Sequence, residues 1–246
     1  MARFFVPKKN LREKKGTIGG AELEHMRKVL RLRPGDRVTL FDDEGWEHEG
    51  IIRSYTEKLG EVEILESARP RRESPLSITL AQALGKGEKM DWIVEKATEL
   101  GVRSIAPFFS SRTVPKLDTE KMERRKARWE KIALSAAKQS GRTQIPEILA
   151  VSDFAELVCR PWQCALKLLF WEGESRRSLT EMREETARLD SLLLVIGPEG
   201  GFSPEEAAEA MRRGFRPVGL GRRILRTETA ALAAISIVQF LWGDMG

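Results

Sequence analysis

Apolar residues in the first 65 positions recur mostly in short runs. Four of these runs predict strands, at 4–6, 38–41, 46–53 and 61–65. Between them, an apolar face at helical spacing predicts a helix over 21–31, formed by Leu23, Met26, Val29 and Leu30. Turn sequences such as Pro34-Gly35-Asp36 separate the segments. The pattern therefore predicts a small mixed barrel or sheet in this part of the chain.

A polar segment with two prolines, 68–75, ends this pattern and predicts a linker. Beyond it, apolar runs alternate between strand and helix spacing. Strands are predicted at 77–84, 104–109, 164–170 and 192–196, and helices at 88–100, 119–140 and 230–242. Because these strands lack polar alternation, they favour a parallel sheet covered on both faces. We therefore expect a β-rich domain at 1–70 and an α/β domain at 74–246.

Charge is distributed in blocks along the 246 residues, although the net charge of +5 alone says little. Residues 1–37 hold eleven Lys and Arg against four acids, residues 112–142 hold ten against four, and residues 212–226 hold six arginines and no acid. Residues 38–66 reverse the balance, with nine acids against two bases. A solvated surface explains any single block equally well. The three basic blocks together favour a nucleic acid, because each phosphate contact releases counterions.

Composition narrows the chemistry that the chain can perform. The two cysteines, Cys159 and Cys164, do not form a CxxC pair, and the histidines are His25 and His48. These are too few for a zinc site or a Ser-His-Asp triad, so no metal is expected. No apolar run approaches the ~18 residues of a membrane span, and the N-terminus lacks the apolar segment of a signal peptide. We expect a cytoplasmic protein without a membrane partner, whose chemistry depends on carboxylates, arginines, backbone groups and a bound cofactor.

A glycine-rich turn follows the predicted strand at 192–196 and leads into a helix. Ser203 can cap that helix, Pro204 fits its first position, and Glu206 completes a capping box. In an open α/β sheet, ligands bind outside the carboxyl ends of the strands. The turn matches neither GxGxxG nor a Walker loop, and Glu199 would repel a phosphate, so a cationic or neutral ligand such as S-adenosylmethionine fits better. A plain strand-to-helix turn explains the spacing equally well.

A second turn, 221–226, lies between a short strand and the apolar helix at 230–242. Thr227 can cap the helix, and Glu228 favours its positive end. Since the helix is apolar nearly all round, we expect it to be buried in the cover of the sheet or in a dimer interface. Arg226 and Glu228 could simply pair and cap, but a dense charge cluster before so apolar a helix favours a functional role.

The two turns resemble the signature of the ribosomal RNA small subunit methyltransferase E family, which belongs to the SPOUT superfamily. The resemblance rests on residues 196–203 (IGPEGGFS) and 220–230 (LGRRILRTETA). It extends to residues 82–90, 95–101 and 136–142, and to Arg3-Phe4-Phe5 and Val29-Leu30-Arg31. It therefore covers essentially the whole chain, and its motifs are highly specific in combination.

This resemblance implies a PUA-like β-barrel, followed by a SPOUT-type parallel sheet with a C-terminal trefoil knot. It also implies a homodimer that uses S-adenosylmethionine to methylate N3 of a specific uridine in 16S ribosomal RNA of the small ribosomal subunit. The cofactor pocket carried over from the family consists of three loops, of which the first matches the family least. Its residues are Leu169, Glu172, Gly197, Pro198, Glu199, Gly200, Gly201, Leu220, Gly221, Ile224, Leu225, Arg226 and Thr227.

Methylation at N3 of uridine places a clear demand on the catalytic residues. N3 bears a proton and is a poor nucleophile, so the site needs a base, or a cation against the O2/O4 edge. Arg226 is the candidate cation. Glu228 is the candidate base or the group that orients Arg226, and Glu199 is its weaker rival.

Candidate residues for holding RNA occur in both predicted domains. They are Arg3, Lys8, Lys9, Arg12, Arg27 and Arg31 in the first, and Lys86, Lys89, Arg112, Gln139 and Arg142 in the second. For each lysine alone, a solvated surface charge is the simpler explanation. Trp92 could stack on a base, but the helical spacing around it favours a place in the helix core.

Other functions stay open at this point. A ribose 2′-O-methyltransferase of the same superfamily would usually carry a Ser-Leu-Asn loop before the last helix, where this chain has residues 225–229 (LRTET). A non-catalytic RNA-binding assembly factor would use the basic blocks equally well. It gives no reason for two glycine turns at strand ends, and it predicts no cofactor binding. A nucleotide-binding enzyme is disfavoured because the phosphate loop is missing.

Overall fold

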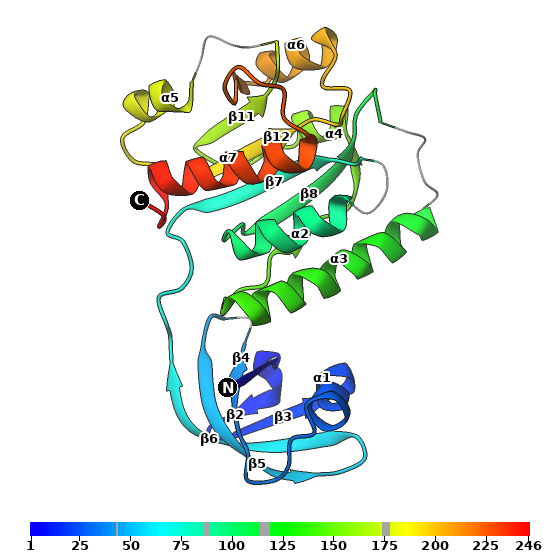
Figure 1. The fold of residues 1–246 in the computed structure, drawn as a ribbon, viewed down its shortest axis with the longest axis vertical. Coiled ribbons are helices and arrows are strands. Elements are labelled where there is room, and N and C mark those ends of the chain that lie inside the picture. Colours follow the sequence, from blue (N-terminus) through cyan, green and yellow to red (C-terminus); the bar gives the residue numbers. More distant parts are fainter. Residues whose placement is uncertain (43, 86–88, 114–118, 174–177) are drawn as a thin grey trace. The chain divides into compact units, whose positions relative to one another are not determined.

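The computed structural model describes residues 1–42, 44–85, 89–113, 119–173 and 178–246. The chain divides into two compact units, each drawn in Figure 1. The first unit is Met1–Glu73 with Ala137–Ile145, and the second is Ser74–Ala136 with Pro146–Gly246. The sequence gives no sign that 137–145 belongs to the first unit, because helical spacing continues unbroken from 119 to 140.

A six-stranded sheet forms the first unit, in the order β1-β4-β5-β6-β3-β2. β1 pairs in parallel with β4, and the other pairs are antiparallel. The sheet packs around a core that includes Phe4, Ile18, Leu40, Ile52 and Val62. The strands are β1 Ala2–Phe5, β2 Leu11–Arg12, β3 Lys15–Gly19, β4 Arg37–Phe41, β5 Glu47–Tyr55 and β6 Leu59–Ala68, with a 3-10 turn, η1, at Lys8–Asn10.

The helix predicted over 21–31 is shorter and less regular than expected. α1 spans Gly20–Glu24, and a π-helical turn, η2, follows at His25–Val29. The amide of Leu30 donates to the carbonyl of His25, five residues earlier, which widens the turn. Leu23 and Met26 are buried as predicted, whereas Val29 and Leu30 are exposed. The wider turn rotates the last two positions off the buried face, so their predicted burial was wrong.

The second unit contains the predicted parallel sheet. Its strand order is β10-β8-β7-β12-β11-β13, with β9 beside β8, and every pair is parallel. The central strand β12 is buried from Leu192 to Ile196, which explains its unbroken apolar run. The strands are β7 Ser77–Ala83, β8 Ser104–Phe109, β9 Glu147–Ile148, β10 Ser152–Asp153, β11 Leu166–Phe170, β12 Ser191–Ile196 and β13 Arg216–Val218.

Helices cover both faces of this sheet. α7 packs against α2, β7 and β12, and Figure 1 shows α7 (red) with α2 over one face. Phe154 and Leu157 of α4 join Ala207 and Ala210 of α6 in a core cluster with Leu193 of β12, on the other face. The helices are α2 Lys89–Glu99, α3 Thr119–Ser140, α4 Phe154–Cys159, α5 Leu179–Glu185, α6 Pro204–Arg212 and α7 Thr227–Trp242. In the part of the chain that the structure describes, no helix has the length and apolar character needed to cross a membrane.

The last helix, α7, is buried on one face only. Ala231, Ile235 and Val238 are fully buried against the unit. Ile237 and Phe240 remain 38% and 63% exposed. α7 therefore covers the sheet, which is one of its two expected places, and an apolar face stays uncovered within a single chain.

Candidate functional site

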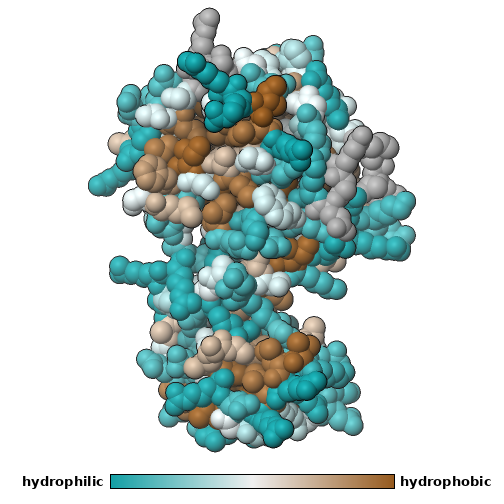
Figure 2. Space-filling model, in the orientation of Figure 1, coloured by the Kyte–Doolittle hydropathy of each residue, from teal (hydrophilic) through white to brown (hydrophobic). Residues whose placement is uncertain are grey.

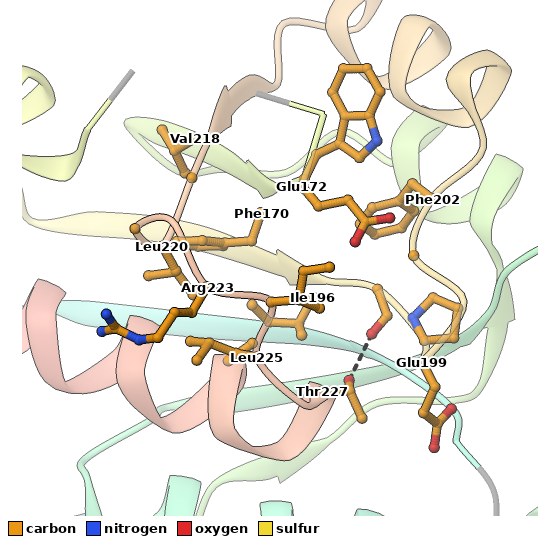
Figure 3. Close-up of a pocket in the computed structure, with 18 of the residues that line it drawn as sticks. Phe170, Glu172, Ile196, Glu199, Phe202, Val218, Leu220, Arg223, Leu225 and Thr227 are labelled. Atoms are coloured by element: carbon orange, nitrogen blue, oxygen red, sulfur yellow. Dashed lines mark hydrogen bonds between the residues drawn. The ribbon is translucent and has the colours of Figure 1, made fainter. Parts of the chain in front are cut away.

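The carboxyl ends of three neighbouring strands meet at one edge of the parallel sheet. β11 lies between β12 and β13, and the strand register aligns Phe170 with Ile196 and with Val218. Each of these residues ends its strand, so the three loops that follow begin side by side. All three line a cavity of about 210 Å³, shown in Figure 3. The cavity thus occupies the place where parallel α/β sheets bind ligands.

Ten of the thirteen residues carried over for cofactor binding line this cavity: Glu172, Gly197, Pro198, Glu199, Gly201, Leu220, Gly221, Ile224, Leu225 and Thr227. Leu169, Gly200 and Arg226 are not among its lining residues. Leu169 precedes Phe170 on β11, so its side chain faces the opposite side and is buried in the core. A Cβ added at Gly200 would point toward the side chain of Arg112. The side chain of Arg226 is exposed. These three residues lie outside the lining of the cavity, and cofactor binding by all thirteen stays a prediction.

The cavity has nine further lining residues, of which Phe170 and Trp171 belong to the first of the three expected loops and the other seven were not expected. They are Phe170, Trp171, Ile196, Phe202, Val218, Gly219, Arg222, Arg223 and Ala230. The Phe202 ring lies close to Gly197, where an added Cβ would be 3.1 Å from a ring atom. Glycine at 197 therefore lets an aromatic side chain close one side of the cavity. A capping box at Ser203 and Glu206, as predicted, begins α6 directly behind Phe202.

A buried chain of hydrogen bonds joins the cavity loops to the centre of the sheet. Gln82, at the end of β7, donates through Nε2 to Oγ1 of Thr227 at 2.9 Å. Thr227 Oγ1 in turn donates to the carbonyl oxygen of Gly197 at 2.7 Å, the dashed line in Figure 3. Thr227 is the first residue of α7, and its hydroxyl group links the loop at Gly197 to β7. The prediction that Thr227 caps the helix was wrong. Arg226 occupies the cap position, without a side-chain hydrogen bond to the helix.

Replacing Thr227 with valine is expected to destabilise the second unit. Valine keeps the shape but leaves the Gly197 carbonyl and the Gln82 amide without their buried partner, which costs about 1–3 kcal/mol. The free energy of unfolding in urea measures this loss. The matched control is Thr229→Val, two residues later on α7 and exposed, which should change stability by less than about 0.5 kcal/mol. Equal effects of the two variants would contradict the proposed link.

Two carboxylates give the cavity a negative side. Glu172 follows β11, and its Oε1 would be 2.8 Å from a Cβ added at Gly201. Gly201 has a φ of +67°, a backbone conformation that favours glycine. Glu199 follows β12 and also lines the cavity. The Glu172 carboxylate suits a ligand that carries positive charge, whereas Glu199 is paired with Lys89.

The predicted catalytic residues do not pair with each other. Glu228 lies in the first turn of α7, and Oε2 of Glu228 is 3.4 Å from Nζ of Lys89. Lys89 Nζ also donates to Oε1 of Glu199 at 2.9 Å. The hydrogen bond to Glu199 is the main reason that the pKa of Lys89 is raised above its usual value, so this lysine remains a cation. Among the ion pairs of the described residues, none joins Arg226 to Glu228.

The residues predicted to hold RNA fall into two groups. Some form ion pairs or hydrogen bonds within the protein. Arg142 is 5% exposed and forms an ion pair with Glu73 at 2.7 Å, and Arg3 forms one with Glu47 at 2.7 Å. Their guanidinium groups therefore hold the first unit together. Lys8 pairs with Glu44 at 2.6 Å, while Lys89 and Arg112 bind Glu199 and the carbonyl of Gly200. Lys86 lies outside the described residues.

The other candidates are exposed. Lys9 and Arg12 line a hollow on the surface of the first unit together with Lys14 and Lys15. Arg27, Arg31 and Gln139 are exposed as well, and the Arg27 guanidinium lies over the Tyr55 ring, 5.2 Å from its centroid. Trp92 is 44% exposed, so its expected place in the helix core was wrong. Within the described ranges, no three His, Cys, Asp or Glu side chains gather as metal ligands do.

Comparisons with known proteins identify the family. A model of the RNA methyltransferase domain matches residues 72–239, and one of the RNA methyltransferase PUA domain matches residues 18–65. Ribosomal RNA small subunit methyltransferase E from Bacillus subtilis is 33% identical over 98% of this chain and 96% of its own length. A methyltransferase from Legionella pneumophila, solved with the bound cofactor SAM, is 36% identical and covers 98% of both chains with a TM-score of 0.89.

A second solved structure is similar over its full length. It is a ribosomal RNA small subunit methyltransferase E from Neisseria gonorrhoeae bound to S-adenosyl methionine, 35% identical, with a TM-score of 0.88 and coverage of 100% of both chains. These similarities extend across the β-rich unit and the parallel-sheet unit alike. The chain therefore belongs to the ribosomal RNA small subunit methyltransferase E family.

Proposed function

We propose that this protein transfers a methyl group from S-adenosylmethionine to N3 of a specific uridine in 16S ribosomal RNA of the small ribosomal subunit. The observation that carries the proposal is the cavity at the ends of β11, β12 and β13, lined by the glycine turns that the family signature contains. The PUA domain match adds an RNA-binding unit, and the basic residues of the first unit suit phosphates. A cytoplasmic location follows from a ribosomal substrate.

The lining of the cavity fits this cofactor. Apolar side chains such as Phe170, Ile196 and Leu225 can cover an adenine, and backbone groups of the loop that follows β13 can bind its edge. Glu172 matches the positive charge of the ligand. The cofactor supplies an electrophilic methyl group on a sulfonium, so the protein needs no metal for this chemistry.

The protein must make uridine N3 nucleophilic. Arg226 is exposed beside the cavity loop and free of a cap bond, so it can approach the O2/O4 edge of a base. A cation there stabilises negative charge as it develops on the ring. Glu228, in the first turn of α7, is the group proposed to accept the N3 proton.

The uncovered face of α7 supports a homodimer. Ile237 and Phe240 are exposed on this face, and Ile224 of the cavity loop is 85% exposed. A second copy of the chain would bury these residues next to the cavity. The C-terminal trefoil knot that the family resemblance implies is part of the same proposal; in it, the segment from β13 to α7, which packs on β7, β12 and α2, would form the knotted region.

Calorimetric titration with S-adenosylmethionine tests the proposed cofactor. Saturable binding with a stoichiometry of one per chain is expected. The rival account, a non-catalytic RNA-binding assembly factor, predicts no heat of binding with or without RNA. That result would refute the methyltransferase proposal.

Charge removal on the surface hollow should weaken RNA binding and its dependence on salt. The variant replaces Lys9, Arg12, Lys14 and Lys15 with alanine, and each lost phosphate contact lowers the slope of log K against log salt by about 0.7–0.9. Filter binding to small-subunit RNA at several salt concentrations measures the slope. The control replaces four exposed cations elsewhere in the same unit, Lys28, Arg37, Arg53 and Lys58. The same change of slope in both variants would show that the hollow has no special role.

A further inference from the structure

Lys89 connects two carboxylates from separate segments of the chain. It is the first residue of α2, and its Nζ lies 2.9 Å from Oε1 of Glu199 and 3.4 Å from Oε2 of Glu228. Glu199 lines the cofactor cavity, and Glu228 lies in the first turn of α7. One lysine therefore holds Glu228 next to the edge of the cavity.

The Glu228 carboxylate has an oxygen that is ready to accept a hydrogen bond. Oε2 of Glu228 is buried and has no hydrogen-bond partner among the described residues. Lys89 contacts this oxygen at an ion-pair distance, while its hydrogen bond goes to Glu199. The charge of Lys89 offsets part of the cost of burying this oxygen, and a ligand that brings an N–H donor would complete its hydrogen bonding. The N3–H group of uracil is a donor of this kind.

We propose that Lys89 is the positioning residue for Glu228 in the methylation step, anchored through Glu199 so that Oε2 of Glu228 stays available to the target base. This inference rests on the proposed function. Lys89 acts here through Glu228, in addition to any contact with RNA phosphates.

The step that Lys89 supports is a proton transfer. The N3–H bond of the uracil breaks, the proton forms an O–H bond with Oε2 of Glu228, and the electron pair stays on N3. That electron pair forms the new bond to the methyl carbon, while the electrons of the old bond remain on sulfur and leave a neutral thioether. Charge balances, because one carboxylate and one sulfonium are neutralised together. The side chain of Lys89 keeps the accepting oxygen in place throughout.

Lys96 offers a matched control on the same helix. Its Nζ also lies between two carboxylates, 2.8 Å from Glu95 and 2.8 Å from Glu99, and its side chain is 32% exposed against 34% for Lys89. Both partners of Lys96 belong to α2 itself. Lys89 differs because it joins the two loops of the functional site.

The experiment compares Lys89→Met, Lys89→Arg and Lys96→Met with wild type, using small-subunit RNA and S-adenosylmethionine. In Lys89→Met, kcat should fall about 10- to 100-fold, because the base loses its orientation. The dissociation constant for the cofactor should stay the same or decrease, since one positive charge next to Glu199 is removed. Lys89→Arg should restore part of kcat, and Lys96→Met should behave as wild type.

A second readout separates positioning from folding. In a double-mutant cycle, Glu228→Gln should lower kcat much less in the Lys89→Met background than in wild type. Both changes remove the same function, the accepting oxygen held in place by Lys89. Full additivity, or a kcat within about twofold of wild type in Lys89→Met, would overturn the inference and leave the proposed function intact. A wild-type protein that binds cofactor and RNA without methylating would overturn both.

Discussion

Replacing Gly201 with valine is expected to abolish measurable binding of S-adenosylmethionine. Gly201 has a φ of +67°, and an added Cβ would be 2.8 Å from Oε1 of Glu172. A β-branched side chain would thus strain the backbone and displace a carboxylate that lines the cavity. We expect affinity to fall at least ~100-fold, about 2.7 kcal/mol, as measured by calorimetry.

Gly214→Val is the matched control for this experiment. Gly214 has a φ of +81°, so valine meets the same backbone strain there, but the nearest atom to the added Cβ is Nζ of Lys167 at 3.7 Å, away from the cavity. This control should bind cofactor normally, even if its melting temperature falls as far as that of Gly201→Val. Normal binding by Gly201→Val would show that the cofactor lies elsewhere.

Replacing Arg226 with alanine should lower turnover far more than cofactor affinity. The side chain is exposed, makes no cap bond and does not line the cavity, so stability and cofactor binding should barely change. If its cation stabilises charge on the uracil ring, kcat should fall about 10²- to 10³-fold. Initial rates at saturating cofactor, beside a calorimetric titration, separate the two effects.

Arg212→Ala serves as the control for Arg226. Arg212 is exposed on α6, pairs with Glu209 on the same helix and does not line the cavity. Its loss should leave kcat unchanged. If Arg226→Ala keeps near-normal turnover, the assignment of Arg226 as the catalytic cation is wrong, and Lys89 with Glu228 becomes the better account of catalysis.

The sequence predicted the elements that position the site, because local patterns determine them. The run 192–196 reads as a buried strand and is buried in β12. The capping box at Ser203 fixes the start of α6 at Pro204. Two shorter helices, α4 and α5, were missed although their own capping boxes at Asp153 and Ser178 carry the same signal. Strand β13 is short and contains a proline, so it ended two residues earlier than expected.

The details of the cavity depend on tertiary contacts that a single sequence does not show. Ile196 and Val218 read as core residues, because an apolar strand end looks the same whether it faces a helix or a cavity, and Phe170 was expected at the cavity only through the family resemblance. Only the register of the three strands reveals that they form one row. In the same way, the links of Lys89 to Glu199 and Glu228 span 110 and 139 residues of sequence, beyond the reach of helical spacing.

The most direct test of the account is nucleoside analysis of small-subunit RNA after incubation with the protein and S-adenosylmethionine. RNA from cells that lack this activity is digested, and the methylated nucleosides are separated by chromatography and identified by mass spectrometry. The account predicts one 3-methyluridine per RNA, absent with Arg226→Ala at short times. A ribose-methylated nucleoside, or no methylated nucleoside at all, would contradict it.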